Sequence, residues 1–428
     1  MKKIQSVVFL LVVFSLLAAP NIYARDILSQ IHPYITVKEE YNDNLYLTKE
    51  NKKRDFITTI TPGIRFDNMD AKSGIVLDVN AGPVFYYDYS NLNYISANAS
   101  LDAKYLTTSH WNFYLRESFT RSDSPREREY FTTDNKYLLA TETTRSPYWR
   151  NIISPTVEYQ FGPESRVGVT YRNNIYQATA EGSENSMENY ASPFIVYWLN
   201  RQHGVSASYE YTNGHFENST DFNSHKVNGS YMYRFSPKAM ASLNGAYTKY
   251  IYATDFDYDV YDASIGISYT FTPTLSASAQ VGYYWADKLD KNGITFKGDI
   301  IQKQGPRTTY VFSIQGGYTY DAFTSQNLGF REYYRATGSV THFLDKRFSV
   351  GCLGSVEWSQ SDPEATDPSD PGLRETIWGA GANASYYPFK WLRATLEYNY
   401  NMRNTNFYHE AQYEYIENRI MLSLTATY

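Results

Sequence analysis

The sequence predicts an all-β fold, a single transmembrane antiparallel up-and-down β-barrel of about 20 strands, with about 18 as the alternative count. Three observations lead to this prediction. Apolar and polar residues alternate along most of the chain, short and long connections join the alternating stretches in turn, and the last stretch ends in an aromatic residue. Successive side chains of a strand point to opposite faces, so each stretch has one apolar and one polar face.

The N-terminus predicts a cleaved secretory signal peptide over residues 1–24, which leaves residues 25–428 as the barrel domain. Two lysines follow the initial methionine, an apolar run extends from Val7 to Ala19, and Ala24 precedes the predicted cleavage point. A basic start, a short apolar core and a small residue before the cleavage point are typical of such leaders. The run is shorter than the roughly 20 residues that span a bilayer, which disfavours an uncleaved anchor.

The alternating stretches follow one another to the end of the chain without a linker or a low-complexity tract. In the first quarter they are Ile35–Tyr41, Ile60–Phe66, Ile75–Ala81 and Ile95–Tyr105. Later they include Val205–Tyr211, Val227–Tyr233, Ala263–Phe271, Phe348–Val356 and Leu392–Tyr398. Their second face carries Ser, Thr, Asn and Gly with scattered charges, as the wall of a water-filled lumen does.

The connections predict the orientation of the barrel. Short ones are expected around Asn68–Asp70, Thr107–His110, Gly162–Ser165, Asn200–Gln202, Ser236–Lys238, Thr272–Thr274, Thr324–Gln326, Asp345–Lys346 and Pro388–Lys390. Longer polar ones are expected at Asn42–Arg54, Ser122–Pro147, Ala178–Glu188, Asn213–Phe222, Lys288–Pro306, Ser361–Arg374 and Asn404–Tyr413. Short turns lie on the periplasmic side of outer-membrane barrels and long loops on the outside. Gln326–Phe343 fits either a tight hairpin or one long strand, which leaves the count at 20 or 18.

The last stretch places five residues on one apolar face: Ile420, Leu422, Leu424, Ala426 and Tyr428. A terminal aromatic residue on such a strand resembles the C-terminal signal of bacterial outer-membrane β-barrels. The resemblance implies that these residues are an assembly signal and that the barrel-assembly machinery is a partner. It also implies a location in the bacterial outer membrane, with outer-membrane lipid and lipopolysaccharide around the barrel.

The composition agrees with a barrel. The chain has 43 Tyr, 23 Phe and 7 Trp, and such residues suit the two membrane interfaces, where an apolar ring and a polar tip both find partners. No stretch after the leader is long and apolar enough for a transmembrane helix. The formal net charge of −6 argues against a nucleic-acid partner. Cys352 is the one cysteine, so an intrachain disulfide is excluded.

Two short motifs near the N-terminus carry a more specific resemblance. Glu40-Tyr41-Asn42-Asp43-Asn44-Leu45-Tyr46 is followed by Thr61-Pro62-Gly63-Ile64. The pattern of Tyr41, Asp43 and Asn44 with Pro62 and Gly63 resembles the signature of outer-membrane β-barrel porins associated with exosortase and exopolysaccharide-export loci. The resemblance implies a conduit or accessory for export of extracellular polysaccharide, with the polysaccharide and periplasmic export proteins as partners. A general or solute-selective diffusion porin and a structural or adhesion barrel with a plugged lumen are the alternatives.

The motif residues also have a structural interpretation. Asn42, Asp43 and Asn44 favour turns, because their side chains bond nearby backbone groups, and they are expected to end the first strand. Pro62 has no backbone donor, so it belongs at a bulge or a ladder edge.

Charged residues on the polar face are the candidate lumen residues. They are Arg65, Asp78, Arg116, Glu158, Arg172, Glu210, Arg393, Glu397 and Arg419. The long loop Ser122–Pro147 is a candidate constriction, with basic residues such as Arg145 that are expected to meet Glu158 and Glu210.

Catalysis is not predicted, and neither is a cofactor or a metal. No pair of the seven histidines has the spacing of metal ligands on one strand face, and no nucleophile, histidine and acid combination stands out. The acidic loop residues near Asp257 and Asp367 fit either divalent-cation bridging to lipopolysaccharide or a solvated loop face.

Overall fold

The computed structural model describes residues 29–70, 72–107, 110–123, 145, 147–179, 183–254, 257–320, 330–362, 374–405 and 414–428. The predicted signal peptide, residues 1–24, lies outside them. The described residues contain one short 3₁₀ helix, η1 (Ser90–Leu92), and no helix that is long and apolar enough to cross a membrane.

All other elements are strands, each 12 to 16 residues long. They are β1 (Ile31–Asn42), β2 (Asp55–Met69), β3 (Ser73–Tyr86), β4 (Tyr94–Leu106), β5 (Trp111–Ser122), β6 (Tyr148–Gln160), β7 (Arg166–Ala178), β8 (Ser186–Trp198), β9 (His203–Phe216), β10 (Phe222–Ser236), β11 (Ala239–Tyr252), β12 (Asp257–Thr272), β13 (Leu275–Ala286), β14 (Lys291–Gln304), β15 (Thr308–Tyr320), β16 (Phe330–Phe343), β17 (Phe348–Asp362), β18 (Arg374–Phe389), β19 (Leu392–Thr405) and β20 (Tyr415–Thr427). Strands of this length are tilted across a bilayer.

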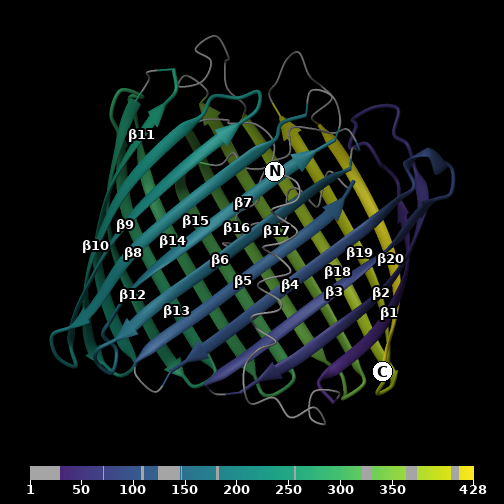
Figure 1. Ribbon diagram of the computed structural model, residues 1–428, viewed down its shortest axis with the longest axis horizontal. Coiled ribbons are helices and arrows are strands. Elements are labelled where there is room, and N and C mark those ends of the chain that lie inside the picture. Colours follow the sequence, from purple (N-terminus) through teal and green to yellow (C-terminus); the bar gives the residue numbers. More distant parts are fainter. Residues whose placement is uncertain are drawn as a thin grey trace.

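The strands form one closed antiparallel barrel. Each strand pairs with the next along the chain, and β1 pairs with β20 from Tyr34↔Thr427 to Asn42↔Arg419, which closes the 20-stranded sheet. Figure 1 shows the tilted strands, with the C-terminus at the end of the barrel that carries the short turns. The predicted fold class and the count of 20 are confirmed, and the alternative of 18 is wrong.

One predicted connection, between β13 and β15, is wrong. The segment Lys288–Pro306 was predicted as a long loop, but most of it is β14, and the short turn is at 305–307. The sequence did not predict β14 as a strand because its inward side chains, such as Lys297 and Asp299, are polar and dilute its apolar pattern. The short periplasmic turn predicted at Thr324–Gln326 lies outside the described residues.

Residues that face each other across the ladder share a face of the wall. The outer face carries the exposed apolar side chains, for example Ile265, Leu396 and Leu422. Aromatic rings cluster at both ends of this belt. At the short-turn end the pairs include Trp111–Tyr159 and Phe389–Trp391, and at the long-loop end the rows include Tyr247–Tyr261–Trp285 and Phe296–Tyr334–Trp358. An apolar belt between two girdles of aromatic residues is the lipid-facing surface of a membrane barrel.

The predicted irregularity at Pro62 is present. Pairing of β2 with β3 stops at Thr59↔Val84 and resumes at Gly63↔Asn80. Pro62 has no N–H to donate to the ladder there. A Cβ atom on Gly82 would lie 1.8 Å from the Ile60 carbonyl oxygen, so this close approach of the two backbones requires glycine.

The orientation of the barrel in the membrane can be tested directly. Long connections face the outside, so a tag inserted at Ser183, between β7 and β8, should be labelled by a membrane-impermeant reagent on intact cells. Tags at Gly162 and Pro273, in short turns, should be labelled only after the outer membrane is opened. The reverse pattern would show that the barrel is inserted the other way round.

Candidate functional site in the barrel lumen

All nine candidate lumen residues lie at inward register positions, opposite in parity to the exposed apolar residues of their strands. Arg116 pairs with Asp102 at 3.0 Å, and Arg172 pairs with Glu188 at 2.5 Å. The Asp78 carboxylate accepts a hydrogen bond from the Tyr34 hydroxyl at 2.6 Å. The inner wall is therefore a polar surface in which neighbouring strands exchange ion pairs and hydrogen bonds.

The other six candidates lie along the same wall. Arg65 pairs with Asp67 at 3.0 Å, Glu158 with Arg166 at 3.6 Å and Arg419 with Glu40 at 3.8 Å. Glu210 accepts from Asn228 Nδ2 at 2.7 Å, and Glu397 accepts from Asn399 Nδ2 at 3.3 Å. Arg393 has neither a hydrogen bond nor an ion pair among the described residues, and it lines a cavity of about 510 Å³ near the short-turn end.

The wall is interrupted where β15 approaches its outer end. Pairing of β14 with β15 ends at Phe296↔Gly316, although both strands continue, β14 to Lys291 and β15 to Tyr320. Gly317 follows with a φ of +148°, a conformation that L side chains rarely adopt. Beyond Gly317 the alternation of β15 changes, and Tyr318 lies inside the barrel instead of on its outer face.

The ends of β15 and β16 pack against the inner wall of β12 and β13. The Tyr318 hydroxyl donates to Asp262 Oδ2 at 2.8 Å, and its ring lies 4.8 Å from the Tyr284 ring. Phe330, the first residue of β16, contacts Tyr258, Tyr284 and Tyr318, with ring centroids 5.8 to 6.2 Å apart. Strands β12 and β15 are not neighbours in the sheet, so these contacts form only because the end of β15 leaves the wall.

This group, which we name the luminal aromatic cluster, is buried inside the barrel. Tyr258, Tyr284 and Phe330 are at most 1% exposed. The cluster also contains Phe216, Phe222, Tyr250, Tyr252, Val260, Ala286 and Leu289, with Tyr318 packed against it. Large apolar side chains at inward positions narrow a lumen that is polar elsewhere. One signal in the sequence indicates this feature: the Gly316-Gly317 pair inside a strand pattern favours a bulge or a bend.

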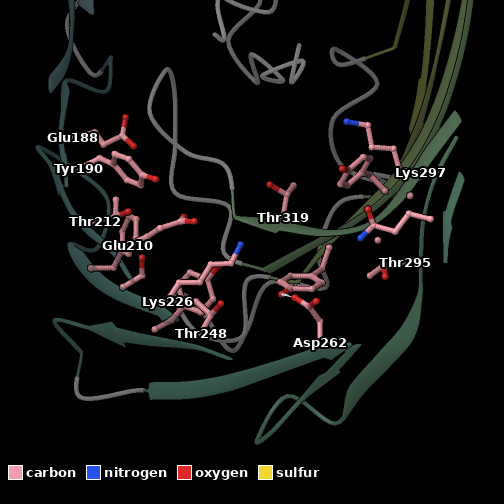
Figure 2. Close-up of a pocket in the computed structure, with 18 of the residues that line it drawn as sticks. Glu188, Tyr190, Glu210, Thr212, Lys226, Thr248, Asp262, Thr295, Lys297 and Thr319 are labelled. Carbon is pink, nitrogen blue, oxygen red and sulfur yellow. Dashed lines mark hydrogen bonds between the residues drawn. The ribbon is translucent and has the colours of Figure 1, made fainter. Parts of the chain in front are cut away.

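A polar cavity of about 410 Å³ lies beside the luminal aromatic cluster. Figure 2 shows Glu188, Tyr190, Glu210 and Thr212 on one side of it and Thr295 and Lys297 on the other, with Thr319 between them. The Arg172 guanidinium lies 4.6 Å from the centre of the Tyr190 ring. The cavity thus combines hydroxyl groups, both signs of charge and ring faces, as a site for a hydrophilic ligand does.

A buried ion network covers the inner wall of β16 to β19. Arg331 donates to Glu357 Oε1 at 2.6 Å, and Arg335 donates to the other oxygen of the same carboxylate. Arg403 Nε donates to Glu375 Oε2 at 2.9 Å. Buried charges persist only when they are paired and hydrogen-bonded, so this network holds the wall in one geometry. The sequence did not predict this network because, of these residues, only Glu357 and Arg335 lie opposite each other in the strand register.

The N-terminal motif that resembles export-associated porins begins at the seam where β1 meets β20. Asp43 accepts hydrogen bonds from the backbone N and the Nδ2 of Asn418, both at 2.7 Å. Asn44 is fully buried and donates to the Ile416 carbonyl oxygen at 3.0 Å, while Asn42 donates to Glu417 Oε1 at 3.0 Å. The turn predicted for these residues is present, and in addition each of them bonds β20.

The remaining motif residues shape the wall beside the seam. Tyr41 faces outward, with its ring 5.1 Å from that of Phe56. Gly63 faces inward under the Tyr34 ring, and a Cβ atom there would lie 2.4 Å from that ring. The predicted assembly residues Ile420, Leu422, Leu424 and Tyr428 are exposed on the outer face, as the register also places Ala426. The Tyr428 backbone N donates to the Pro33 carbonyl oxygen at 2.9 Å.

The contacts predicted for Arg145 are wrong. Instead of meeting Glu158 and Glu210, it is buried near the seam, where Nε donates to the Leu45 carbonyl oxygen at 2.9 Å and Nη1 to the Tyr86 hydroxyl at 2.6 Å. It also pairs with Asp123 at 3.4 Å. Burial raises the pKa of Asp123, although the Arg145 guanidinium acts in the opposite direction. The other basic residues of this loop lie outside the described residues.

The described residues contain no group of three or more His, Cys, Asp or Glu side chains placed to hold a metal ion. Asp257, one of the acidic loop residues, instead pairs with Lys249 at 3.0 Å and with Lys288. The second acidic stretch, near Asp367, lies outside the described residues.

No protein-family model matches the chain, and no curated protein does. Solved structures similar to the chain are outer-membrane barrels. Pseudomonas aeruginosa OccK2, crystallised with glucuronate, is 8% identical with a TM-score of 0.42, and the match covers 93% of this chain and 98% of that one. The siderophore receptor PirA from Pseudomonas aeruginosa is 10% identical with a TM-score of 0.49, over 93% of this chain and 80% of that one. At these identities the likeness concerns the fold alone.

The location follows from the fold. A closed barrel pairs backbone groups between neighbouring strands across a bilayer and leaves no open sheet edge. Single-chain barrels with an apolar outer belt, two girdles of aromatic residues and a polar lumen lie in bacterial outer membranes. The chain is a bacterial outer-membrane β-barrel.

Proposed function

We propose that this barrel is an outer-membrane conduit that is narrowed at rest and serves the export of extracellular polysaccharide. The observation that carries the proposal is the position of Tyr318 and Phe330, which pack against the inner wall of β12 and β13. A barrel of this size is wide enough for a water-filled channel unless elements inside it fill the space. An exporter of a large polymer needs such an obstruction, because a permanently wide pore would remove the barrier function of the membrane.

The polysaccharide cargo is supported by two features. The motif around Asp43 and Pro62 resembles that of barrels associated with exopolysaccharide-export loci. The wall is also rich in groups that hydrogen-bond sugar hydroxyls, for example Thr212, Glu210 and Gln280 in the polar cavity. A saccharide chain presents hydroxyl groups along its whole length, so a wall of donors and acceptors compensates for its lost hydration.

Deletion of the gene tests the proposal in cells. We expect polysaccharide to accumulate in the periplasm and to fall at the cell surface, because synthesis continues while passage through the outer membrane stops. Sugar assays on periplasmic and extracellular fractions measure this, and a plasmid copy should restore the surface polymer. Unchanged fractions in the deletion strain would contradict export.

A solute-selective diffusion porin is the second candidate. The polar cavity favours it, since about 410 Å³ accommodates a small hydrophilic solute. A porin stays open at rest, so it predicts steady channels from the purified protein and normal surface polysaccharide in the deletion strain.

A further inference from the structure

The barrel wall has a local break between β14 and β15. Their pairing ends at Phe296↔Gly316, and five residues of β14 and four of β15 continue toward the outer end without pairing each other. Every other neighbouring pair of described strands stays paired to within one residue of the outer end of at least one strand. The break begins at Gly317, whose φ of +148° lets the end of β15 leave the wall.

The break lies at the level of the outer aromatic girdle. Phe296 faces outward, because its register partner Val281 is an exposed residue of the outer belt, and its ring stacks on that of Tyr334. Such girdles mark the boundary between the acyl chains and the polar headgroups of a membrane. Ile294, the next outward residue of β14, is 55% exposed. The break therefore has an apolar outer rim and opens at the boundary of the outer leaflet.

The polar cavity reaches into this break. Its lining includes Thr295 and Lys297 on the inner face of β14, Phe296 on the outer face and Gly317 at the bend. Figure 2 shows Thr295 and Lys297 on one side of the cavity and Thr319 between the two sides. A cavity that is lined from both faces of the wall connects the lumen with the outer surface. We name this connection, bordered by Thr295, Phe296 and Gly317, the side portal.

The side portal lies on the short-turn side of the luminal aromatic cluster. The cluster occupies the outer ends of the strands, since Tyr252 and Ala286 end β11 and β13 and Phe330 begins β16. Lys226 and Gln280 of the cavity lie several residues farther from that end. A cargo that enters at the short-turn end therefore reaches the portal before the cluster, and it leaves through the wall without passing the obstruction.

The cavity that leads to the portal suits an uncharged polar group. Its three basic and three acidic side chains have formal charges that cancel, so it favours neither sign of charge. They are Arg172, Lys226 and Lys297 against Glu188, Glu210 and Asp262. Hydroxyl and amide groups lie among them, for example Thr212 and Gln280. Such side chains donate to and accept from the hydroxyl groups of a sugar.

We propose that the side portal passes a lipid-linked saccharide from the lumen into the outer leaflet. The sugar lies in the polar cavity, and the acyl chains leave between β14 and β15, where burial in the membrane removes their apolar surface from water. A purely hydrophilic polymer gains nothing from an exit that faces lipid, whereas an amphipathic cargo does. The saccharide part of the cargo rests on the proposed export function, and the lateral path rests on the break and the cavity.

Photo-labelling of the full-length barrel in phospholipid vesicles tests the lateral path. The probe is a diglucosyl diacylglycerol with a diazirine in one acyl chain, and the control lipid is phosphatidylcholine with the same chain. Peptide mapping by mass spectrometry should find several-fold more glycolipid than control lipid on Thr295 and Tyr318, which line the cavity. Both lipids should label Ile265 and Leu396 of the outer belt equally. Equal labelling of Thr295 and Tyr318 by the two lipids would overturn the proposal.

Gly317→Val should close the portal. A β-branched residue disfavours a positive φ, so β15 should continue its pairing with β14 and draw Tyr318 back into the wall. Labelling of Thr295 by the glycolipid should fall to the level of the control lipid, while the resting conductance should rise, which also shows that the variant has folded. Gly354→Val is the matched control, because a Cβ atom there meets nothing within 4 Å.

The two parts of the account fail in different ways. Glycolipid labelling that persists in Gly317→Val would overturn the portal. Absence of labelling together with reduced surface polysaccharide in the deletion strain would reject the portal and retain export. Specific labelling together with normal surface polysaccharide would support the portal and reject polysaccharide export.

Discussion

Replacing Asp43 and Asn44 together by alanine should prevent most of the protein from accumulating as a closed barrel. The two side chains bond Asn418 and Ile416 of β20, so the change removes three hydrogen bonds across the seam. Hydrogen bonds that involve a charged group contribute about 1.5 to 3 kcal/mol each, and a buried group left unpaired adds a further penalty. We therefore expect a loss of about 4 kcal/mol or more, comparable to the total stability of many domains.

The position of these bonds increases their effect. The strands that they join are about as far apart in sequence as the chain allows, so their pairing closes the longest loop and carries a high entropic cost. A barrel without this pairing exposes two unpaired strand edges to lipid, where unsatisfied backbone groups are expensive. An unclosed chain should be degraded in the periplasm.

Heat-modifiable mobility on SDS gels and the amount in outer-membrane fractions measure this effect. Asn93→Ala is the matched control, because Asn93 Oδ1 also accepts a backbone hydrogen bond, from the Tyr86 N at 2.8 Å, but within one hairpin. The control should assemble nearly normally. Equal assembly of the double variant and the control would show that the motif does not stabilise the seam.

Phe330→Ala should convert a quiet barrel into a conducting one. Phe330 is 1% exposed and contacts three tyrosine rings, so its removal leaves a cavity in the luminal aromatic cluster. Replacing a buried phenylalanine by alanine costs about 3 to 5 kcal/mol. If the cluster stabilises only the narrowed state, a change of about 3 kcal/mol shifts the balance toward the open state more than 100-fold.

Tyr318→Phe should act in the same direction with a smaller effect. It removes the hydrogen bond to Asp262 but keeps the ring, so the open fraction should increase about tenfold. Phe343→Ala, at the other end of β16, is the control and should leave the resting conductance unchanged. Single-channel recordings measure the open fraction of each variant. No increase for Phe330→Ala would show that the cluster does not obstruct the lumen.

Most of the barrel could be predicted because strand alternation and turn formation depend on residues that are close in sequence. The alternation in stretches such as Ile60–Phe66 follows from the two-residue repeat of a strand between lipid and water, and the turn at Asn42–Asn44 follows from side chains that bond nearby backbone groups. These features need no knowledge of which strands are neighbours.

The remaining features depend on contacts between distant residues. β14 was predicted as part of a loop because its inward residues, such as Lys297 and Asp299, are polar and obscure the apolar pattern of the strand. The Gly316-Gly317 pair indicates a bend in β15 but not where Tyr318 lies, because Tyr318 continues the apolar alternation of the strand and is inside the barrel only as a result of the backbone conformation. The contact of Arg145 with Leu45 spans 100 positions of sequence, and nothing near either residue indicates the other.

The resting conductance of the intact barrel tests the central claim most directly. Purified full-length protein in a planar bilayer should be silent or open only intermittently, because Tyr318 and Phe330 hold the ends of β15 and β16 against the inner wall. Large, steady channels from the intact protein, with the same conductance as Phe330→Ala, would contradict a conduit that is narrowed at rest.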